Sequence, residues 1–253
     1  MSVVSVLIPV YNRKALAVQC VKSVLDQTFE DYEIVIVDNN STDGTYENLS
    51  DEFAAEKRIR LYRNEENIGP VRNWIKCAEL AKSPYAKILF SDDLMSPNFL
   101  ERTLPFMLNK KCGFVYSPAI IGSSNWEGSA HYQFSPDDCR LDKNFYIRSS
   151  FHLFNLMPVS PGAGIFRTND LRRNILTELD GIEGYDFCHT GAGVDWLIYI
   201  LTALNYQHVA YVSDPLVYFR DHLDSITIKN ENNDVARGYI LARKWLSERL
   251  VGL

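Results

Sequence analysis

The sequence has few cysteines, and their arrangement fits neither a disulfide scaffold nor a Cys-x-x-Cys site. It carries five cysteines in 253 residues, an odd number, and they are widely separated. This pattern indicates thiols that mostly fill a core in a reducing compartment. We therefore expect a cytoplasmic protein.

The sequence also lacks a long basic run and a membrane-spanning stretch. Its 26 Lys and Arg residues are outnumbered by 32 Asp and Glu residues, and the formal net charge of -6 does not favour a nucleic-acid partner. The apolar residues 3–10 are too few to span a bilayer and follow no basic segment. We expect no nucleic-acid binding, no secretion signal and no transmembrane anchor.

No Gly-x-Gly-x-x-Gly motif follows this first apolar run. Pro9, Val10, Tyr11 and Asn12 occupy that position, and they form neither a glycine-rich nor a basic phosphate loop. The sequence therefore disfavours a nicotinamide-dependent oxidoreductase and a nucleotidyltransferase.

What the sequence does contain is an alternation of apolar, strand-like runs with helical periodicity. The expected strands are 2–10, 31–37, 58–63, 86–90 and 112–117, and the expected helices are 14–26, 45–56, 71–81 and 97–109. This alternation predicts an α/β fold with a Rossmann-like, mainly parallel sheet flanked by helices. The chain length suits one large domain.

The pattern is less regular after residue 117. Residues 118–145 combine Gly, Ser, Asn, Pro and Asp with isolated aromatics, which predicts a loop beside the site. Further helices are expected at 145–156, 169–176, 194–204 and 234–250, and strands at 165–167, 206–212 and 216–219. The last helix is basic and amphipathic, so it either packs on the domain, which we favour, or contacts an anionic membrane.

Two adjacent carboxylates, Asp92 and Asp93, follow the apolar run 86–90. Ligands of open α/β sheets bind at the carboxyl ends of strands. Neighbouring carboxylates repel each other unless a cation or hydrogen-bond donors separate them, as when Mg2+ or Mn2+ bridges a diphosphate. The alternative is a helix cap followed by a solvated acid.

Five stretches follow one another along the chain: residues 5–12 (SVLIPVYN), 27–38 (QTFEDYEIVIVD), 41–45 (STDGT), 67–73 (NIGPVRN) and 91–93 (SDD). In this order they resemble family 2 glycosyltransferases with the GT-A fold. Residues 220–227 (RDHLDSIT) and Asp195 extend the resemblance into the second half. It implies a single GT-A domain over 1–253, in which 1–117 bind a nucleotide-sugar and 118–253 bind the acceptor.

The resemblance implies a donor site at the ends of the first strands. The residues that it assigns to nucleotide binding are Pro9, Val10, Tyr11, Asp38, Asn67, Arg72 and Asp92. A flat base suits an aromatic platform such as Tyr11, and a fixed carboxylate, here Asp38, can accept the uracil imide proton. Asp92 would meet the ribose or a metal-bound water.

The resemblance also implies a divalent metal ion, Mn2+ or Mg2+, held by Asp93 and His222. Because the leaving nucleoside diphosphate is strongly anionic, Lewis-acid neutralisation lowers the barrier to its departure. Ser91 stands where the family's Asp-x-Asp motif has its first acid. The motif therefore leaves open which carboxylate contacts the metal and which contacts the ribose.

Asp195 resembles the catalytic base of the family. An inverting transfer needs a carboxylate within hydrogen-bond reach of the acceptor hydroxyl, on the face opposite the leaving group. Val194 stands where relatives often have Glu. Asp180, Glu183 and Asp186 are the alternative bases.

These roles together imply an inverting, metal-dependent glycosyltransferase. We expect it in the cytoplasm, and contact of the last helix with the inner face of the membrane is the alternative to packing on the domain. The donor would be a nucleotide-sugar, with UDP favoured, and the acceptor a hydroxyl of a glycan or lipid-linked glycan in bacterial surface polysaccharide biosynthesis. Ser91 and Val194 keep open a second interpretation, a non-catalytic sugar-nucleotide-binding or scaffold protein of the same fold.

Overall fold

Strands and helices alternate through the first half of the computed structural model, which describes residues 2–124, 126–153, 155–222 and 233–250. The strands are β1 Val4–Val10, β2 Tyr32–Asp38, β3 Ile59–Arg63, β4 Tyr85–Ile88, β5 Leu94–Met95, β6 Cys112–Tyr116, β7 Ala119–Ser124, β8 Glu127–His131, β9 Cys139–Asp142, β10 Gly164–Arg167, β11 His208–Tyr211 and β12 Val217–Arg220. The helices are α1 Lys14–Leu25, α2 Thr45–Glu52, α3 Pro70–Leu80, α4 Phe99–Met107, α5 Lys143–His152, α6 Thr168–Asn174, α7 Phe187–Thr190, α8 Val194–Ala203 and α9 Asp234–Arg249, with a 3-10 turn η1 at Pro161–Ala163.

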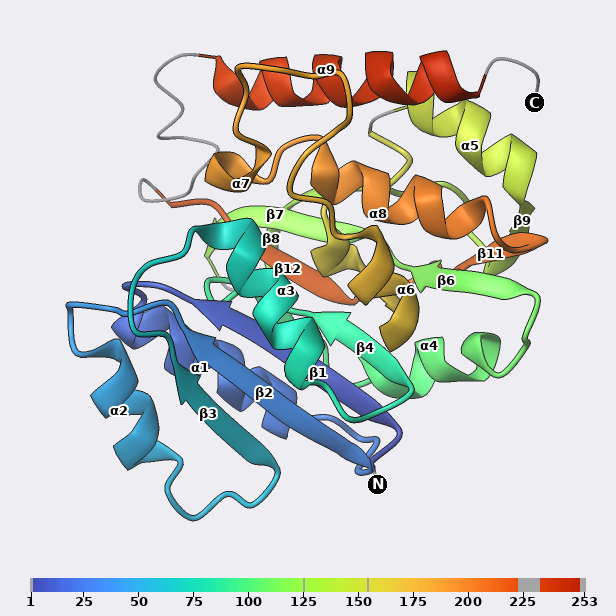
Figure 1. The fold of residues 1–253 in the computed structure, drawn as a ribbon. Coiled ribbons are helices and arrows are strands. Elements are labelled where there is room, and N and C mark those ends of the chain that lie inside the picture. Colours follow the sequence, from blue (N-terminus) through green and yellow to red (C-terminus); the bar gives the residue numbers. More distant parts are fainter. Residues whose placement is uncertain (1, 125, 154, 223–232, 251–253) are drawn as a thin grey trace.

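The large sheet has the strand order β3-β2-β1-β4-β10-β6-β11-β9. Strands β3, β2, β1 and β4 are parallel, whereas β10 runs antiparallel to both of its neighbours. Figure 1 shows α3 in front of this sheet and α1 behind it. The predicted α/β class with a mainly parallel, helix-flanked sheet is therefore confirmed.

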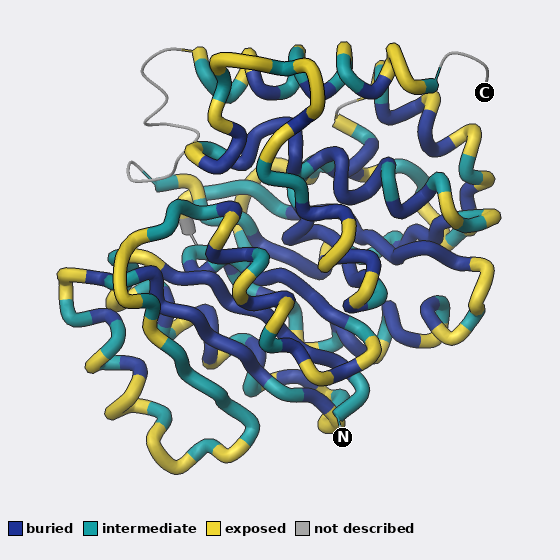
Figure 2. Tube along the Cα trace, viewed as in Figure 1, coloured by how far each residue is buried: buried dark blue, intermediate teal, exposed yellow. Residues whose placement is uncertain are grey.

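Strand β1 lies inside the parallel part of the sheet, and all seven of its residues are buried. Such a strand is apolar along its whole length because helices cover both faces. Figure 2 shows the central strands as buried and the outer helices as partly exposed. The parallel register pairs Val10 with Asp38, so the carboxyl ends of β1 and β2 meet at one edge.

The segment 118–145, expected to be a loop, instead forms β7, β8 and β9, and that expectation is wrong. Strands β7 and β8 belong to a second sheet with the order β5-β12-β7-β8. The residues of β8 are mostly exposed and polar, so they carry no period-two apolar pattern. The pairing of β7 with β12, which lies far along the chain, supplies what the local sequence does not show.

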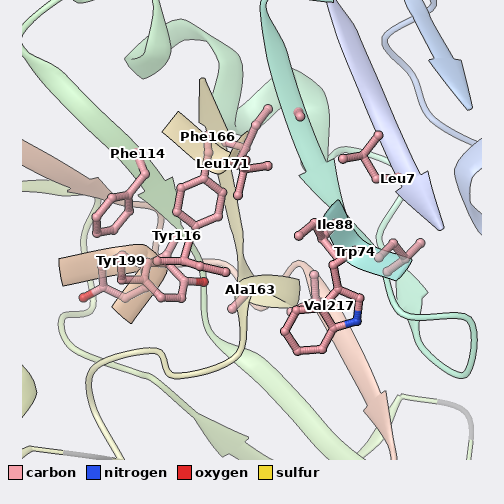
Figure 3. Packing of buried hydrophobic residues seen from close by; sticks show 14 of the residues in the cluster. Leu7, Trp74, Ile88, Phe114, Tyr116, Ala163, Phe166, Leu171, Tyr199 and Val217 are labelled. Atoms are coloured by element: carbon pink, nitrogen blue, oxygen red, sulfur yellow. The ribbon is translucent and has the colours of Figure 1, made fainter. Parts of the chain in front are cut away.

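A cluster of aromatic rings fills the core between β6, β10 and α8. The ring centroid of Phe114 lies 4.9 Å from Tyr199, 5.2 Å from Tyr146 and 5.5 Å from Phe166. Figure 3 shows Phe114, Tyr116, Phe166 and Tyr199 gathered on one side, with Trp74 and Ile88 on the other. Edge-to-face and tilted contacts of this kind add to the free energy of burial.

The C-terminal helix α9 packs on the body of the protein over α8 (Figure 1). Its buried residues are Gly238, Ala242 and Leu246. In the described part of the chain, no helix has both the length and the apolar character needed to cross a membrane.

We expect Phe114→Ala to lower the free energy of unfolding by about 3–5 kcal/mol, because the removed ring is fully buried among other rings. The matched control is Phe145→Ala on α5, where the ring is 47% exposed and the expected loss is about 1 kcal/mol or less. Urea unfolding measures both. Equal losses in the two variants would show that the ring cluster does not stabilise the core.

Candidate active site

The end of β1 and the turn that follows it lie against the turn after β2. Pro9 and Val10 are buried in β1, whereas Tyr11 directly after them is 41% exposed. Asn12 adopts a φ of 50°, and its Oδ1 accepts the backbone N–H of Thr42 at 2.8 Å. The Asn12 side chain therefore joins the two turns and leaves the ring of Tyr11 at the surface.

Asp38 ends β2 and is completely buried. Its Oδ2 accepts the backbone N–H of Ser41 at 2.9 Å and lies 3.6 Å from Nε of Arg63. Its Oδ1 has no hydrogen-bond partner among the described residues. Because a buried carboxylate oxygen without a donor is costly, this atom is suited to accept an N–H from a ligand.

A network of asparagines fixes the loop that carries Asn67. Asn39 donates to Oδ1 of Asn67 at 2.7 Å, and Asn64 donates to Oδ1 of Asn39 at 2.9 Å and of Asn73 at 3.0 Å. The Oδ1 of Asn67 is therefore engaged in holding the loop beside the end of β2. Arg72 lies exposed in the first turn of α3 and makes no hydrogen bond or ion pair within the described residues.

The structure brings Asp92, but not Asp93, to His222. Oδ2 of Asp92 lies 3.0 Å from Nε2 of His222 and 3.4 Å from Nε of Arg13. Asp93 is buried, and its Oδ1 accepts the backbone N–H of Arg220 at 3.1 Å. Burial and the charge of Asp92 raise the pKa of Asp93 well above its usual range.

Asp92 and His222 suit two neighbouring ligands of one divalent ion. Two donor atoms placed at right angles about 2.1 Å from an ion are about 3 Å apart, which matches the separation of these two atoms. Asp93 fits this role less well, since its oxygen already binds the backbone of Arg220. Across the described residues, no three His, Cys, Asp or Glu side chains form a metal cluster. Residues 223–227 of the RDHLDSIT motif, including Ser225 and Thr227, lie outside the described residues.

Asp195 lies in the first turn of α8. Its Oδ1 accepts the backbone N–H of Gly193 at 2.8 Å and of Trp196 at 2.7 Å, and its Oδ2 accepts the hydroxyl of Tyr239 at 2.6 Å. Burial raises the pKa of Asp195 to about 7, although the three hydrogen bonds oppose this. A carboxyl group that titrates near neutral pH suits a general base.

The three alternative bases, Asp180, Glu183 and Asp186, are exposed. The side chain of Asp186 also accepts the backbone N–H of Cys188 and so caps α7. The geometry therefore favours Asp195 over these neighbours.

Trp74 connects the loop before Asp195 to the turn that carries Asp92. Its ring centroid lies 5.3 Å from that of Phe90, immediately before Ser91. On its other side, a Cβ at Gly191 would lie 2.3 Å from Cη2 of Trp74, and Gly191 has a φ of 78°. Only glycine fits here, so the loop before Asp195 packs directly on α3.

Sequence reasoning missed three residues that shape the site: Arg13, Trp74 and Lys87. Lys87 is fully buried in β4, its ammonium group donates to the carbonyl of Gly162, and burial lowers its pKa to about 7. A lysine inside an apolar strand needs a polar partner when it is buried, so its place in the sequence already indicated a specific role for Lys87. Arg13 directly follows the Tyr11-Asn12 turn, which indicated a place near the site. Nothing in the sequence around Trp74 indicated its role.

Comparison with known sequences identifies relatives over part of the chain. The profile described as Glycosyl transferase family 2 matches residues 5–174. TuaG of Bacillus subtilis (strain 168), a glycosyltransferase whose name assigns it provisionally to teichuronic acid biosynthesis, is 38% identical over 114 residues, 45% of this chain and 45% of TuaG. Chondroitin synthase of Escherichia coli is 36% identical over 102 residues, 40% of this chain and 15% of the synthase. The matches thus cover less than half the length of these relatives.

Solved structures share the fold. The crystal structure of S. aureus TarS 1-349 in complex with UDP-GlcNAc matches with a TM-score of 0.72 and 18% identity, covering 97% of this chain and 66% of that chain. The TarS 1-349 structure with UDP matches with a TM-score of 0.68 and 19% identity, covering 98% and 70%. This likeness confirms the expected GT-A fold.

We expect Asp195→Asn to raise the melting temperature by at least about 2 °C at about pH 8 and to have no such effect at about pH 4. The raised pKa means that the folded protein holds this proton more tightly than the unfolded chain does, so the ionised carboxylate lowers stability as the pH rises from about 4 through 7. Asparagine keeps an oxygen for the backbone N–H groups and carries no charge.

Thermal unfolding at the two pH values measures this effect, with the exposed Asp180→Asn as the control. A melting temperature that falls at pH 8 in Asp195→Asn would contradict the raised pKa.

Proposed function

Because this chain belongs to Glycosyl transferase family 2, we propose that it is an inverting, metal-dependent glycosyltransferase that uses a UDP-sugar. Residues 1–117 bind the donor and residues 118–253 bind a glycan or lipid-linked glycan. Relatives named for teichuronic acid biosynthesis and chondroitin synthesis support a role in surface polysaccharide assembly, and the TarS complexes with UDP and UDP-GlcNAc support the donor class.

The contact between Asp92 and His222 is the observation that carries this proposal. The two residues are 130 positions apart, yet their oxygen and nitrogen atoms are 3.0 Å apart at the end of the sheet. A helix cap needs only one acid, whereas this turn places Asp92 next to both His222 and a second acid, Asp93. The pairing favours Asp92 and His222 as the metal ligands and assigns Asp93 to holding Arg220 in place.

Donor binding uses the ends of β1 and β2. Tyr11 offers its exposed ring to the base, Pro9 and Val10 support that ring, and the open Oδ1 of Asp38 accepts the uracil imide N–H. Arg72 and the loop of Asn67 border the same edge. A divalent ion held by Asp92 and His222 would neutralise the charge of the departing diphosphate.

Proton transfer uses Asp195. Its Oδ2 accepts the proton of the acceptor hydroxyl while that oxygen bonds to the anomeric carbon. The bond from this carbon to the diphosphate oxygen breaks on the opposite face, so the configuration inverts and the nucleoside diphosphate keeps the electron pair. Asp195 is only partly exposed, which limits the access of water to this step.

The cellular location forms part of the same proposal. All five cysteines are free thiols, as expected in the cytoplasm. Arg237, Lys244 and Arg249 are exposed on α9. These charges can meet an anionic membrane surface that presents a lipid-linked acceptor.

Calorimetric titration with UDP, with and without Mn2+, tests the donor site. We expect Asp92→Asn to weaken Mn2+-dependent UDP binding by about tenfold or more, because a ligand of the ion is lost. The adjacent Asp93→Asn keeps an oxygen for the N–H of Arg220, so Mn2+ dependence should persist in this matched control. The assignment of Asp92 as a metal ligand would be contradicted if UDP binding by the parent did not depend on Mn2+. It would also be contradicted if Asp92→Asn kept the Mn2+-dependent binding of the parent.

A further inference from the structure

The C-terminal helix α9 supplies a hydrogen bond to the candidate base. The hydroxyl of Tyr239 donates to Oδ2 of Asp195 at 2.6 Å, across 44 positions of sequence. We propose that Tyr239 is a positioning residue that holds the carboxylate of Asp195 in place, which makes α9 part of the acceptor side of the active site. This inference rests on the function proposed above.

The helix backbone is fixed at this point. A Cβ at Gly238, next to Tyr239, would lie 2.5 Å from the carbonyl oxygen of Ala192 and 2.5 Å from the hydroxyl of Tyr185. The hydroxyl of Tyr185 donates to the carbonyl of Asp234 at 2.6 Å. The glycine thus lets α9 contact the loop before Asp195 directly, and Tyr239 is presented by a rigid element.

Three donors hold the two carboxylate oxygens of Asp195. Backbone N–H groups of Gly193 and Trp196 bind Oδ1, and Tyr239 binds Oδ2. A carboxylate oxygen has two lone pairs, so Oδ2 keeps one for the acceptor hydroxyl. The carboxylate is therefore oriented without being blocked.

The remaining titratable and charged groups around Asp195 are Tyr132, Tyr185, Tyr199 and Arg243. Among the described side chains, Tyr239 is the one that hydrogen-bonds to the Asp195 carboxylate. Burial and the charge of Asp195 raise the pKa of Tyr239 well above its usual range, so its hydroxyl remains a donor at neutral pH. This bond stabilises the ionised carboxylate and lowers the pKa of Asp195 against the effect of burial.

Without the hydroxyl of Tyr239, the ionised carboxylate of Asp195 loses a donor, so the pKa of Asp195 rises further. A hydrogen bond to a charged group corresponds to a change of about one pH unit or more. Because the base acts only when ionised, the acidic limb of the rate profile moves to higher pH.

The test compares Tyr239→Phe with Tyr185→Phe. Each variant removes one hydroxyl that ties α9 to the body, but only the first hydroxyl contacts Asp195. Carbon-13 NMR titration of labelled aspartate, assigned with Asp195→Asn, measures the pKa directly. Release of UDP from a panel of UDP-sugars with Mn2+, followed across pH, measures the rate profile.

We expect Tyr239→Phe to raise both the NMR pKa and the acidic limb by about one pH unit, while Tyr185→Phe keeps the parent values. An unchanged pKa in Tyr239→Phe, or an equal rise in Tyr185→Phe, would overturn the inference. A rise in the NMR pKa together with no UDP release by the parent would instead refute the proposed function and leave the hold of Tyr239 on Asp195 intact.

Discussion

The candidate site depends on Arg220, because this residue joins parts of the chain that are far apart in sequence. Its backbone N–H binds Asp93, and its guanidinium group donates to the carbonyl of Asp92, to Gln19 and to the carbonyl of Leu16 at 3.2 Å. These contacts fix the end of β12 on the turn after β4, and they place His222 beside Asp92. The positive charge also offsets the repulsion between the two adjacent carboxylates.

Three acids of the candidate site are in states that folding alone does not favour. Asp38, at the end of β2, keeps one buried oxygen without a donor among the described residues, and burial raises the pKa values of Asp93, after β4, and of Asp195, in the first turn of α8. Acids with such perturbed pKa values are typical of functional sites. Trp74 packs against Phe90, close before Asp93 in sequence, and Lys87 binds the carbonyl of Gly162 while its charge acts on the same acid.

The local pattern of apolar and polar residues was sufficient to predict the parallel half of the fold. The apolar run of β1 and the helical spacing of α1 and α3 mark these elements, and strand ends point to Asp38 and Asp92. Long-range pairing was not predictable, because β7 pairs with the distant β12, and β8, which pairs with β7, has no apolar alternation of its own. The choice between Asp92 and Asp93 depends on His222 and Arg220, and the role of Tyr239 depends on how α9 docks, which no nearby residue indicates.

A crystal structure of the protein with UDP and Mn2+ tests the central claim most directly. We expect the uracil ring to lie on Tyr11, with its imide nitrogen within hydrogen-bond distance of Oδ1 of Asp38. The metal ion should contact Asp92 and His222 while Asp93 keeps its bond to the backbone of Arg220. A nucleotide bound away from the ends of β1 and β2, or a metal held by Asp93 without Asp92, would contradict this assignment.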